Sequence, residues 1–348
     1  MNFVKICLAV LLFSAFLSAA CNNNNHPVVT TLAGNGALGF ADGDAKSASF
    51  SNPMGVAVDS SGNVFVADSR NNLIRKIAPD GMVSTFAGSG KQGAVNGKGT
   101  AASFFFPTAL ATDASGNVFV ADTHNSLIRK ITPDGMVTTF AGKPTKVIND
   151  IRDTAGMDHP SGIAVDKNGN VFVSDLNKDF IKKITPAGKV SIIAGNGDRG
   201  KKDGKGGASS FYLPVGLAID ATENLYVCDS YNNMIRKISP DGMVTTLAGR
   251  SKKGSADGKD TTASFWHPNS LTVDKNGNVY VADMGNNKIR KIAPDGTMTT
   301  FAGSNAHGAD NGPIRQASFY QPYGIASDKA GNLYVADYQN NLIRKIAF

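Results

Sequence analysis

The sequence predicts an all-β fold, a six-bladed β-propeller whose blades are four-stranded antiparallel sheets. Three observations predict it. A segment of about 54 residues recurs six times, and each copy holds short runs rich in Val, Ile, Phe and Thr. Turn residues separate these runs, with no amphipathic helical stretch between copies. The last copy lacks its fourth run, and a matching run stands near the start of the chain. This pattern is typical of propeller blades.

The period is clearest in an Asp that ends the second run of each copy. It recurs at spacings of 54, 53, 54, 54 and 54 residues, at Asp68, Asp122, Asp175, Asp229, Asp283 and Asp337. In the first full copy we expect strands over Gly55–Asp59, Asn63–Asp68, Leu73–Ala78 and Met82–Ala87. Gly, Asn, Pro and Asp at the intervening positions supply the turns.

The two ends of the repeat array predict how the ring closes. The sixth copy stops at Phe348, before a fourth strand, and Val29–Gly34 matches the fourth strand Val244–Gly249 of another copy. We therefore expect the N-terminal strand to complete the sixth blade. Closure of this kind leaves no sheet edge open to another chain, which favours a monomer.

The first 20 residues have the features of a secretory signal peptide. Lys5 is followed by an apolar run over Ile6–Leu17 and by small residues before Cys21, and the run is too short to span a bilayer. The segment resembles a bacterial lipoprotein signal, which implies a lipidated Cys21. Residues 21–27 are then a polar tether and 28–348 the propeller. We expect an exported lipoprotein of the bacterial cell envelope, on its periplasmic or surface side, anchored only by lipid.

The repeat resembles the NHL repeat. The segments that carry the resemblance are Asn278–Asp283 (NVYVAD), Asn286–Arg290 (NNKIR) and the upstream Pro268, and they recur in register over about residues 28–348. The resemblance implies a six-bladed propeller. Known NHL domains bind proteins or RNA, serve as sensor ectodomains or, in a few cases, act as lyases, so the fold alone assigns no function.

Charged residues that repeat in every blade predict structural roles. Twelve of the 35 basic residues form pairs in the third strands: Arg75-Lys76, Arg129-Lys130, Lys182-Lys183, Arg236-Lys237, Arg290-Lys291 and Arg344-Lys345. We expect one member of each pair to lie between blades, bonded to acidic or backbone groups of the neighbouring blade, and the other to face solvent. The net charge of +7 is then spread around the rim, which with export argues against a nucleic-acid partner.

The Asp residues that end the first and second strands of every blade are expected to accept hydrogen bonds from the turn that follows. The loops between blades are 18 residues long, or 17 for Lys143–His159, and loops of this length usually have a function. Most carry a Phe three residues before the next Pro, which we expect to plug the loop into the blade. Lys143–His159 has Met157 there and departs most from the pattern, so we expect it to contribute to function.

Residues that flank the first Pro of each blade vary while their surroundings repeat. This predicts a binding site on the face formed by the long loops and the second-to-third strand turns. The candidate binding residues are Asn52, Phe106, Asp158, His159, Leu213, His267, Asn269, Gln321 and Tyr323. The expected partner is an envelope protein or a polysaccharide.

The alternative is a metal-dependent lyase or hydrolase at the channel mouth, with Asp158, His159 and His267 as candidate zinc or calcium ligands. Peptidyl-amidoglycolate lyases, which resemble this architecture, bind zinc through His residues that follow the Pro, where blade five has Asn269. Gluconolactonase-like propellers need a channel Glu, whereas Glu223, the only Glu, is expected on the opposite face. Binding without a cofactor is therefore favoured over catalysis.

Replacing Cys21 with Ser should release the protein from the membrane or block its processing, because the lipid on Cys21 would be the only anchor. Membrane partition of wild type and variant, measured after cell fractionation, tests this. An unchanged membrane fraction would contradict lipidation.

Overall fold

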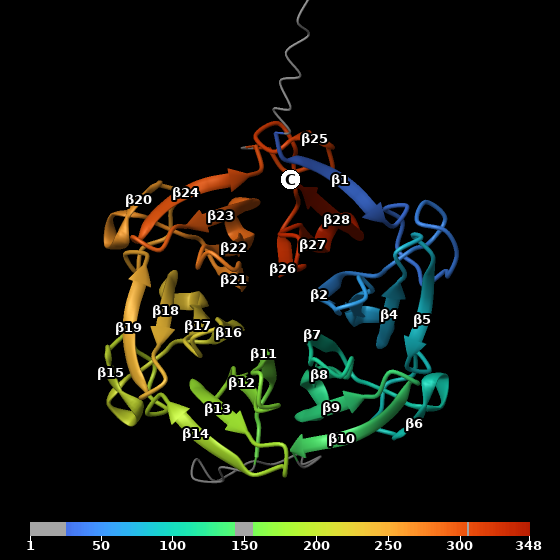
Figure 1. The fold of residues 1–348 in the computed structure, drawn as a ribbon, viewed down its shortest axis with the longest axis horizontal. Helices are drawn as coiled ribbons and strands as arrows, with labels where there is room; N and C mark the ends of the chain where they lie inside the picture. Colours follow the sequence, from blue (N-terminus) through green and yellow to red (C-terminus); the bar gives the residue numbers. More distant parts are fainter. Residues whose placement is uncertain (1–25, 143–155, 305) are drawn as a thin grey trace, which may run out of the picture.

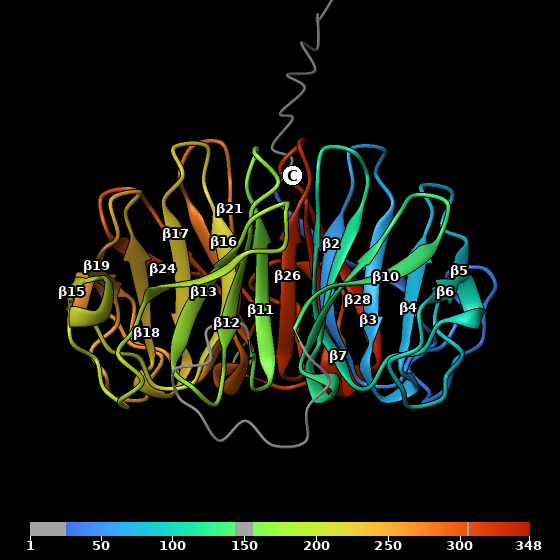
Figure 2. The same ribbon diagram turned by 90° about the horizontal axis from the view of Figure 1, so that it is seen from below.

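The computed structural model describes residues 26–142, 156–304 and 306–348. In these residues six antiparallel sheets form blades around a central axis (Figure 1), as predicted. Seen edge-on, the inner strands run roughly along that axis (Figure 2). The expected signal peptide, Cys21 and most of the Lys143–His159 loop lie outside the described residues.

Every blade has the same strand order from the axis outward. The innermost strands begin at the repeated Pro: β2 (Pro53–Val58), β7 (Pro107–Thr112), β11 (Pro160–Val165), β16 (Pro214–Ile219), β21 (Pro268–Val273) and β26 (Pro322–Ser327). The second strands are β3 (Val64–Asp68), β8 (Val118–Asp122), β12 (Val171–Asp175), β17 (Leu225–Asp229), β22 (Val279–Asp283) and β27 (Leu333–Asp337). We number the blades one to six in this order.

The third strands carry the basic pairs: β4 (Leu73–Ile77), β9 (Leu127–Ile131), β13 (Phe180–Ile184), β18 (Met234–Ile238), β23 (Lys288–Ile292) and β28 (Leu342–Ala347). The fourth strands are β5 (Val83–Ala87), β10 (Met136–Gly142), β14 (Val190–Ala194), β19 (Met243–Ala248), β24 (Thr297–Ala302) and, for blade six, β1 (Val28–Ala33). Strand bounds differ from the predicted ones by one or two residues.

Within the described residues, four blades have an additional outer strand that was not predicted. The loop that precedes each of these blades pairs with its fourth strand through two residues: β6 (Gly97–Lys98), β15 (Gly204–Lys205), β20 (Gly258–Lys259) and β25 (Gly312–Pro313). Asp-Gly and Asn-Gly segments of the long loops lead into these strands. In blade one the same place holds a single bridge between Gly43 and Val83.

The helical segments are short 3-10 turns. Five join second and third strands: η1 (Ser69–Asn71), η3 (Thr123–Asn125), η5 (Ser230–Asn232), η7 (Met284–Asn286) and η8 (Tyr338–Asn340). Three lie in the long loops: η2 (Gly99–Ala101), η4 (Gly206–Ala208) and η6 (Asp260–Thr262). Within the described part of the chain, no helix is long and apolar enough to cross a membrane.

The ring closes as predicted. Strand β1 pairs antiparallel with β28, with Val28 opposite Ala347 and Thr31 opposite Arg344. In Figure 1 the blue β1 lies beside the dark red β28 at the outside of blade six. Strand β1 therefore fills the place of the missing fourth strand, so blade six has the same four main strands as the other blades.

The hydrophobic core lies between the blades rather than within any one of them. In one cluster, Phe65 and Ile74 of blade one pack with Leu110 and Val120 of blade two. Corresponding clusters join each remaining pair of neighbours, including blades six and one. A blade alone would expose both of its faces, so each blade depends on its two neighbours for burial.

The Phe residues expected to plug the loops are fully buried, as predicted: Phe50, Phe104, Phe211, Phe265 and Phe319. Met157 occupies the corresponding place in blade three and is also fully buried. Burial of a side chain of this size stabilises the fold by about 1.5–3 kcal/mol. Each long loop is thereby fixed to the blade that it precedes.

Deletion of residues 28–34 should strongly destabilise the protein or cause aggregation, because it exposes the edge of β28 and one side of the cluster between blades six and one. Deletion of residues 22–26, which precede β1, is the matched control and should have almost no effect. Thermal unfolding compares the two. Equal melting temperatures would contradict closure by β1.

Candidate functional site

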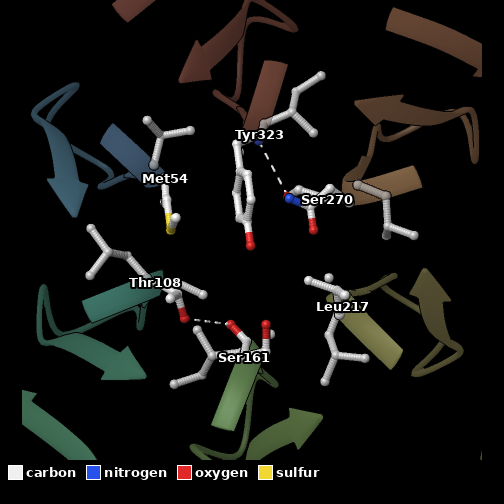
Figure 3. A pocket seen from close by; sticks show the side chains of 18 residues that line it. Met54, Thr108, Ser161, Leu217, Ser270 and Tyr323 are labelled. Atoms are coloured by element: carbon white, nitrogen blue, oxygen red, sulfur yellow. Dashed lines mark hydrogen bonds between the residues drawn. The ribbon is translucent and has the colours of Figure 1, made fainter. Parts of the chain in front are cut away.

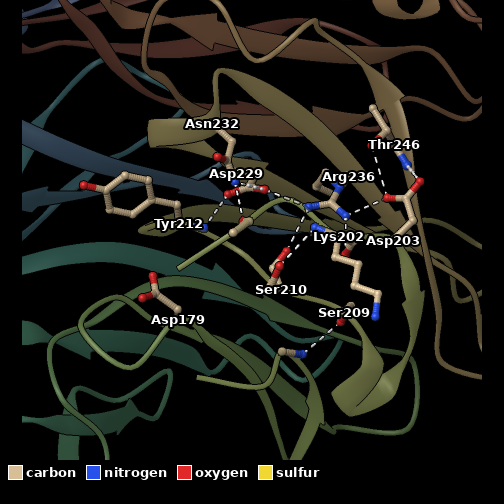
Figure 4. A network of polar contacts seen from close by, with 12 residues as sticks. Asp179, Lys202, Asp203, Ser209, Ser210, Tyr212, Asp229, Asn232, Arg236 and Thr246 are labelled. Atoms are coloured by element: carbon tan, nitrogen blue, oxygen red, sulfur yellow. Dashed lines mark hydrogen bonds and ion pairs between the residues drawn. The ribbon is translucent and has the colours of Figure 1, made fainter. Parts of the chain in front are cut away.

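A buried ion pair ties each loop to its blade. In blade four, shown in Figure 4, the Arg236 guanidinium lies 2.8 Å from Asp229 and 2.6 Å from Asp203 of the loop. It also donates to the backbone carbonyls of Lys202 and Ser210. Arg236 and Asp229 are both fully buried. The Arg236 guanidinium also lies over the ring of the plug Phe211, 5.2 Å from its centroid.

The arrangement recurs with Arg in blades one, two, five and six, and with Lys in blade three. It differs from the prediction in two respects. The basic side chain does not bond to groups of the neighbouring blade; it bonds to the Asp of its own blade and to the loop that precedes it. The second member of the pair is also not free in solvent in five blades, where the Lys ammonium lies 5.5–5.8 Å from the ring of a Phe or Tyr in the second strand.

The two sets of strand-end Asp residues behave differently. Asp59 and its equivalents accept hydrogen bonds from the turn that follows, as predicted, for example from the N–H groups of Ser61 and Asn63. The second-strand Asp residues accept from an Asn side chain of the following turn in five blades, but their backbone donor is the residue 17 positions earlier, two before the Pro. The donors are the N–H groups of Ser51, Phe105, Asp158, Tyr212, Trp266 and Tyr320, at 2.7–2.9 Å.

Burial opposes the charge on these carboxylates. It raises the pKa of Asp229 to about 6, against the hydrogen bonds from the Tyr212 N–H, Asn232 and Arg236 that lower it. The same cause raises the pKa of Asp283 to about 6. The ionised carboxylate of each of these Asp residues is bonded within its own blade and loop. The network therefore positions the loop residues, and these carboxylates are not free to act on a ligand.

The residue before each Pro, chosen from sequence for its variability, has a left-handed backbone. The six are Asn52, Phe106, His159, Leu213, His267 and Gln321, with φ between 48° and 62°. In five of them the N–H donates at 2.6–2.9 Å to an Asn or Asp oxygen of the preceding blade, at Asn341, Asn72, Asp179, Asn233 and Asn287. These bonds hold neighbouring blades together and fix the backbone that bears five of the six variable side chains.

The residues after the Pro line the central channel, and they include the candidates Asn269 and Tyr323. In Figure 3 the Tyr323 ring extends into the centre, with Met54 and Thr108 nearby. The inner strands approach closely, since a Cβ on Gly162 would lie 1.9 Å from the Val215 carbonyl oxygen. The cavity encloses about 50 Å³, room for a few water molecules. A larger ligand does not fit inside this cavity.

Aromatic side chains contact one another on the face formed by the long loops. His124 of η3 stacks on Phe106 at 4.7 Å and meets Phe105 at 4.8 Å and His159 at 5.5 Å between ring centroids. Across blades four and five, Tyr231 meets Tyr212 at 5.1 Å and His267 at 4.9 Å. Burial lowers the pKa of both His124 and His267, so both imidazoles are neutral near pH 7.

Asp158 and His159 form a local polar group rather than an open ligand set. Asp158 Oδ1 lies 2.7 Å from His159 Nδ1 and accepts from Asn177 at 3.1 Å. Burial pushes the pKa of Asp158 up, but these hydrogen bonds outweigh it and lower the pKa. Among the described residues, no group of three His, Cys, Asp or Glu side chains could hold a metal ion. His267 lies beside Tyr231, and Glu223 pairs with Lys167 at 3.0 Å.

Sequence reasoning placed the variable positions on the loop face but missed much of what surrounds them. It omitted His124 and Tyr231, which lie in the 3-10 turns, and Tyr212, Trp266 and Tyr320, which stand two residues before the Pro. A signal for the last three was present, because blades two, four, five and six all have an aromatic residue at that position. The spacing of residues along the sequence does not show which residues of other segments these side chains contact.

Three family models match parts of the repeat array. The family model of the NHL repeat matches residues 319–346, that of the teneurin NHL domain residues 33–96, and that of the SMP-30/Gluconolactonase/LRE-like region residues 208–304. NHL repeat-containing protein 2 of Gallus gallus is 28% identical over 333 residues, which cover 84% of this chain and 46% of that protein. The chain spans less than half the length of the curated relatives it matches.

Solved structures share the fold. A protein of unknown function from Bacteroides thetaiotaomicron superposes with a TM-score of 0.73 at 22% identity, covering 92% of this chain and 76% of that one. An auxiliary nutrient binding protein from Bacteroides ovatus has a TM-score of 0.70 at 19% identity, with the same coverage. At these identities the likeness concerns the architecture.

Substitution of Asp229 with Asn should lower the free energy of unfolding by about 3–5 kcal/mol, because it leaves the buried Arg236 without its full countercharge. Replacing the adjacent Lys237, half-buried over Tyr226, with Gln should cost about 1 kcal/mol or less. Urea unfolding measures both. A similar loss for the two variants would show that the buried pair is not a main determinant of stability.

Proposed function

Since the chain is a six-bladed β-propeller built of NHL-type repeats, we propose that it is an exported binding protein, which recognises a glycan or protein partner on the face formed by its long loops. The partner is held outside the channel, on side chains that differ from blade to blade. The rest of each blade is a repeated scaffold.

One observation carries the proposal: the variable residues before each Pro are held rigidly in a shared geometry. Five of the six are fixed by a hydrogen bond that their backbone N–H donates to the preceding blade. A left-handed backbone is unfavourable for residues such as Phe106 and Leu213, so the scaffold holds strained positions in order to present diverse side chains. Rigid side chains lose little entropy on binding, which favours affinity.

The cell envelope is the proposed location, with Cys21 as the lipidated anchor. The signal-like segment before Cys21 supports this placement. It agrees with the name of the fold neighbour from Bacteroides ovatus, an auxiliary nutrient binding protein. A binding protein tethered outside the cytoplasm would capture or retain its partner next to the membrane.

A metal-dependent lyase or hydrolase is the second candidate, supported by the match of residues 208–304 to the SMP-30/Gluconolactonase/LRE-like region. Elemental analysis of the purified protein discriminates the two functions. Stoichiometric zinc or calcium that is lost in His159→Asn and His267→Asn variants would favour the enzyme.

The proposal is tested with a face variant in which Phe106, His159, Leu213, His267 and Gln321 are each replaced by Asn. Blade one has Asn52 at the same position, and Asn tolerates the left-handed backbone. Stability should therefore change little. Partner recovery from an envelope extract, after crosslinking to the full-length protein, should fall at least tenfold.

The matched control replaces Lys167, Lys275 and Lys329 with Ser, the residue that blade one has at this turn as Ser60. These positions are exposed in the turns between first and second strands, on the opposite face. The control should recover the partner as wild type does. Equal recovery by the face variant would show that binding occurs elsewhere.

A further inference from the structure

We propose that the partner of this protein is an acidic polysaccharide, one rich in uronic acid residues, and that it binds along one half of the loop face. The site is the aromatic arc, which we define as Tyr212, Tyr231, Trp266 and Tyr320 in blades four to six. This inference rests on the proposed function and names the chemical class of its ligand.

The arc is built from one motif that occurs in three consecutive blades. A basic or imidazole side chain lies beside the aromatic ring that stands two residues before the Pro. Arg199 is 5.1 Å from the Tyr212 centroid, Lys253 is 5.2 Å from that of Trp266, and the rings of His307 and Tyr320 are 4.9 Å apart. Blades one and two have Leu38 with Ser51 and Gln92 with Phe105 at these positions.

The backbone fixes both members of each pair. The Gly that follows the basic or imidazole residue donates its N–H to the plug Phe carbonyl, from Gly200 to Phe211, Gly254 to Phe265 and Gly308 to Phe319, at 2.9–3.2 Å. The aromatic residue comes directly after that Phe, and its own N–H is held by the buried Asp of the blade. The pairs are therefore set by the scaffold rather than by contact between flexible side chains.

The rings are exposed although they are large. Tyr231 is 51% exposed, Trp266 40% and Tyr320 37%. Trp266 lies directly against Gly285, where a Cβ would be 2.6 Å from its Cγ, so the absence of a side chain there makes room for the indole. Exposed large aromatic side chains grouped on one face indicate a binding site.

The chemistry of the arc favours sugar over protein. The broad faces of Tyr and Trp pack against the C–H face of a pyranose ring, while the phenol and indole N–H groups bond to its hydroxyls. The core of a protein interface is usually more apolar than the surface around it. In the described part of the loops that bear the arc, no Leu, Ile, Val or Met is among the exposed large hydrophobic residues.

The charge of the arc favours an acidic sugar. The loops 196–213 and 250–267 each contain four basic residues, against one in 35–52, two in 89–106 and one in 304–321. Two of the Asp residues in these loops, Asp203 and Asp257, are already paired with the buried Arg236 and Arg290. Lys253, and Arg199 with only a long ion pair to Asp179 at 3.9 Å, can therefore bind carboxylates of a ligand whose rings lie on Tyr212 and Trp266.

Binding of the full-length protein to polygalacturonate, to a neutral glucan and to polyglutamate tests the proposal by titration calorimetry at low and high salt. Polygalacturonate should bind at least tenfold more tightly than either other probe. Trp266→Ala and Tyr231→Ala should each weaken it at least tenfold. Lys253→Gln should weaken it about threefold or more and reduce its salt dependence. Phe40→Ala, an exposed ring on the loop that precedes blade one, is the control and should bind as wild type.

Each other result overturns the proposal in a defined way. Equal binding of polyglutamate, with no effect of the aromatic substitutions, would show a surface that responds to charge alone. Equally tight binding of the neutral glucan would show that the charges of Arg199 and Lys253 do not contribute to binding. If no probe binds, but the envelope partner is still lost in the face variant, the acidic polysaccharide is wrong while the proposed binding function stands. If the Trp266→Ala variant does not fold, the Tyr231→Ala variant still tests the proposal, because the exposed Tyr231 side chain packs only at the surface.

Discussion

The buried ion pair between an Asp of the second strand and an Arg of the third is the interaction on which the rest of each blade depends. Asp229 and Arg236 are both inaccessible to water, and two charges in such a place are tolerated only when most of their remaining donors and acceptors find partners. Those partners are the backbone groups of the long loop and, through Asp203, its carboxylate, while the buried Arg236 Nε has none among the described residues. The loop is thereby fixed to its blade at several points.

Blade three shows what happens when this interaction is altered. Lys182 takes the place of the Arg, bonds to Asp175 at 2.7 Å and donates to the Gly156 carbonyl. An ammonium has three donors rather than five and lacks the planar fork of a guanidinium. Lys178 also replaces the Asn that bonds to the Asp elsewhere, and Ser126 of blade two replaces the Asn that holds the next loop. The scaffold around Asp158 and His159 thus has fewer constraints than the others.

The architecture was predictable because it follows from features that repeat. Six copies of one Asp and a strand missing at one end and present at the other were enough to predict the blades and the pairing of β1 with β28. The site was less predictable. The left-handed backbone at Phe106 and the contact of His124 with His159 depend on how neighbouring blades are placed, and the role of Asp229 depends on a donor 17 residues earlier. A periodic sequence predicts what each blade shares, whereas a binding face depends on how the blades differ.

Closure by β1 also has a consequence for the time course of folding. Val28 pairs with Ala347, so β1, the first strand of the propeller, finds its partner only after β28, the last strand of the propeller, has been made. Until then blade six has no outer strand, and the cluster that joins it to blade one is incomplete. Contacts this distant in sequence are slow to form, and an open array of blades offers unpaired edges to other chains. A chain that crosses a membrane before it folds would meet this stage outside the cytoplasm, where the final closure becomes the slow step of its maturation.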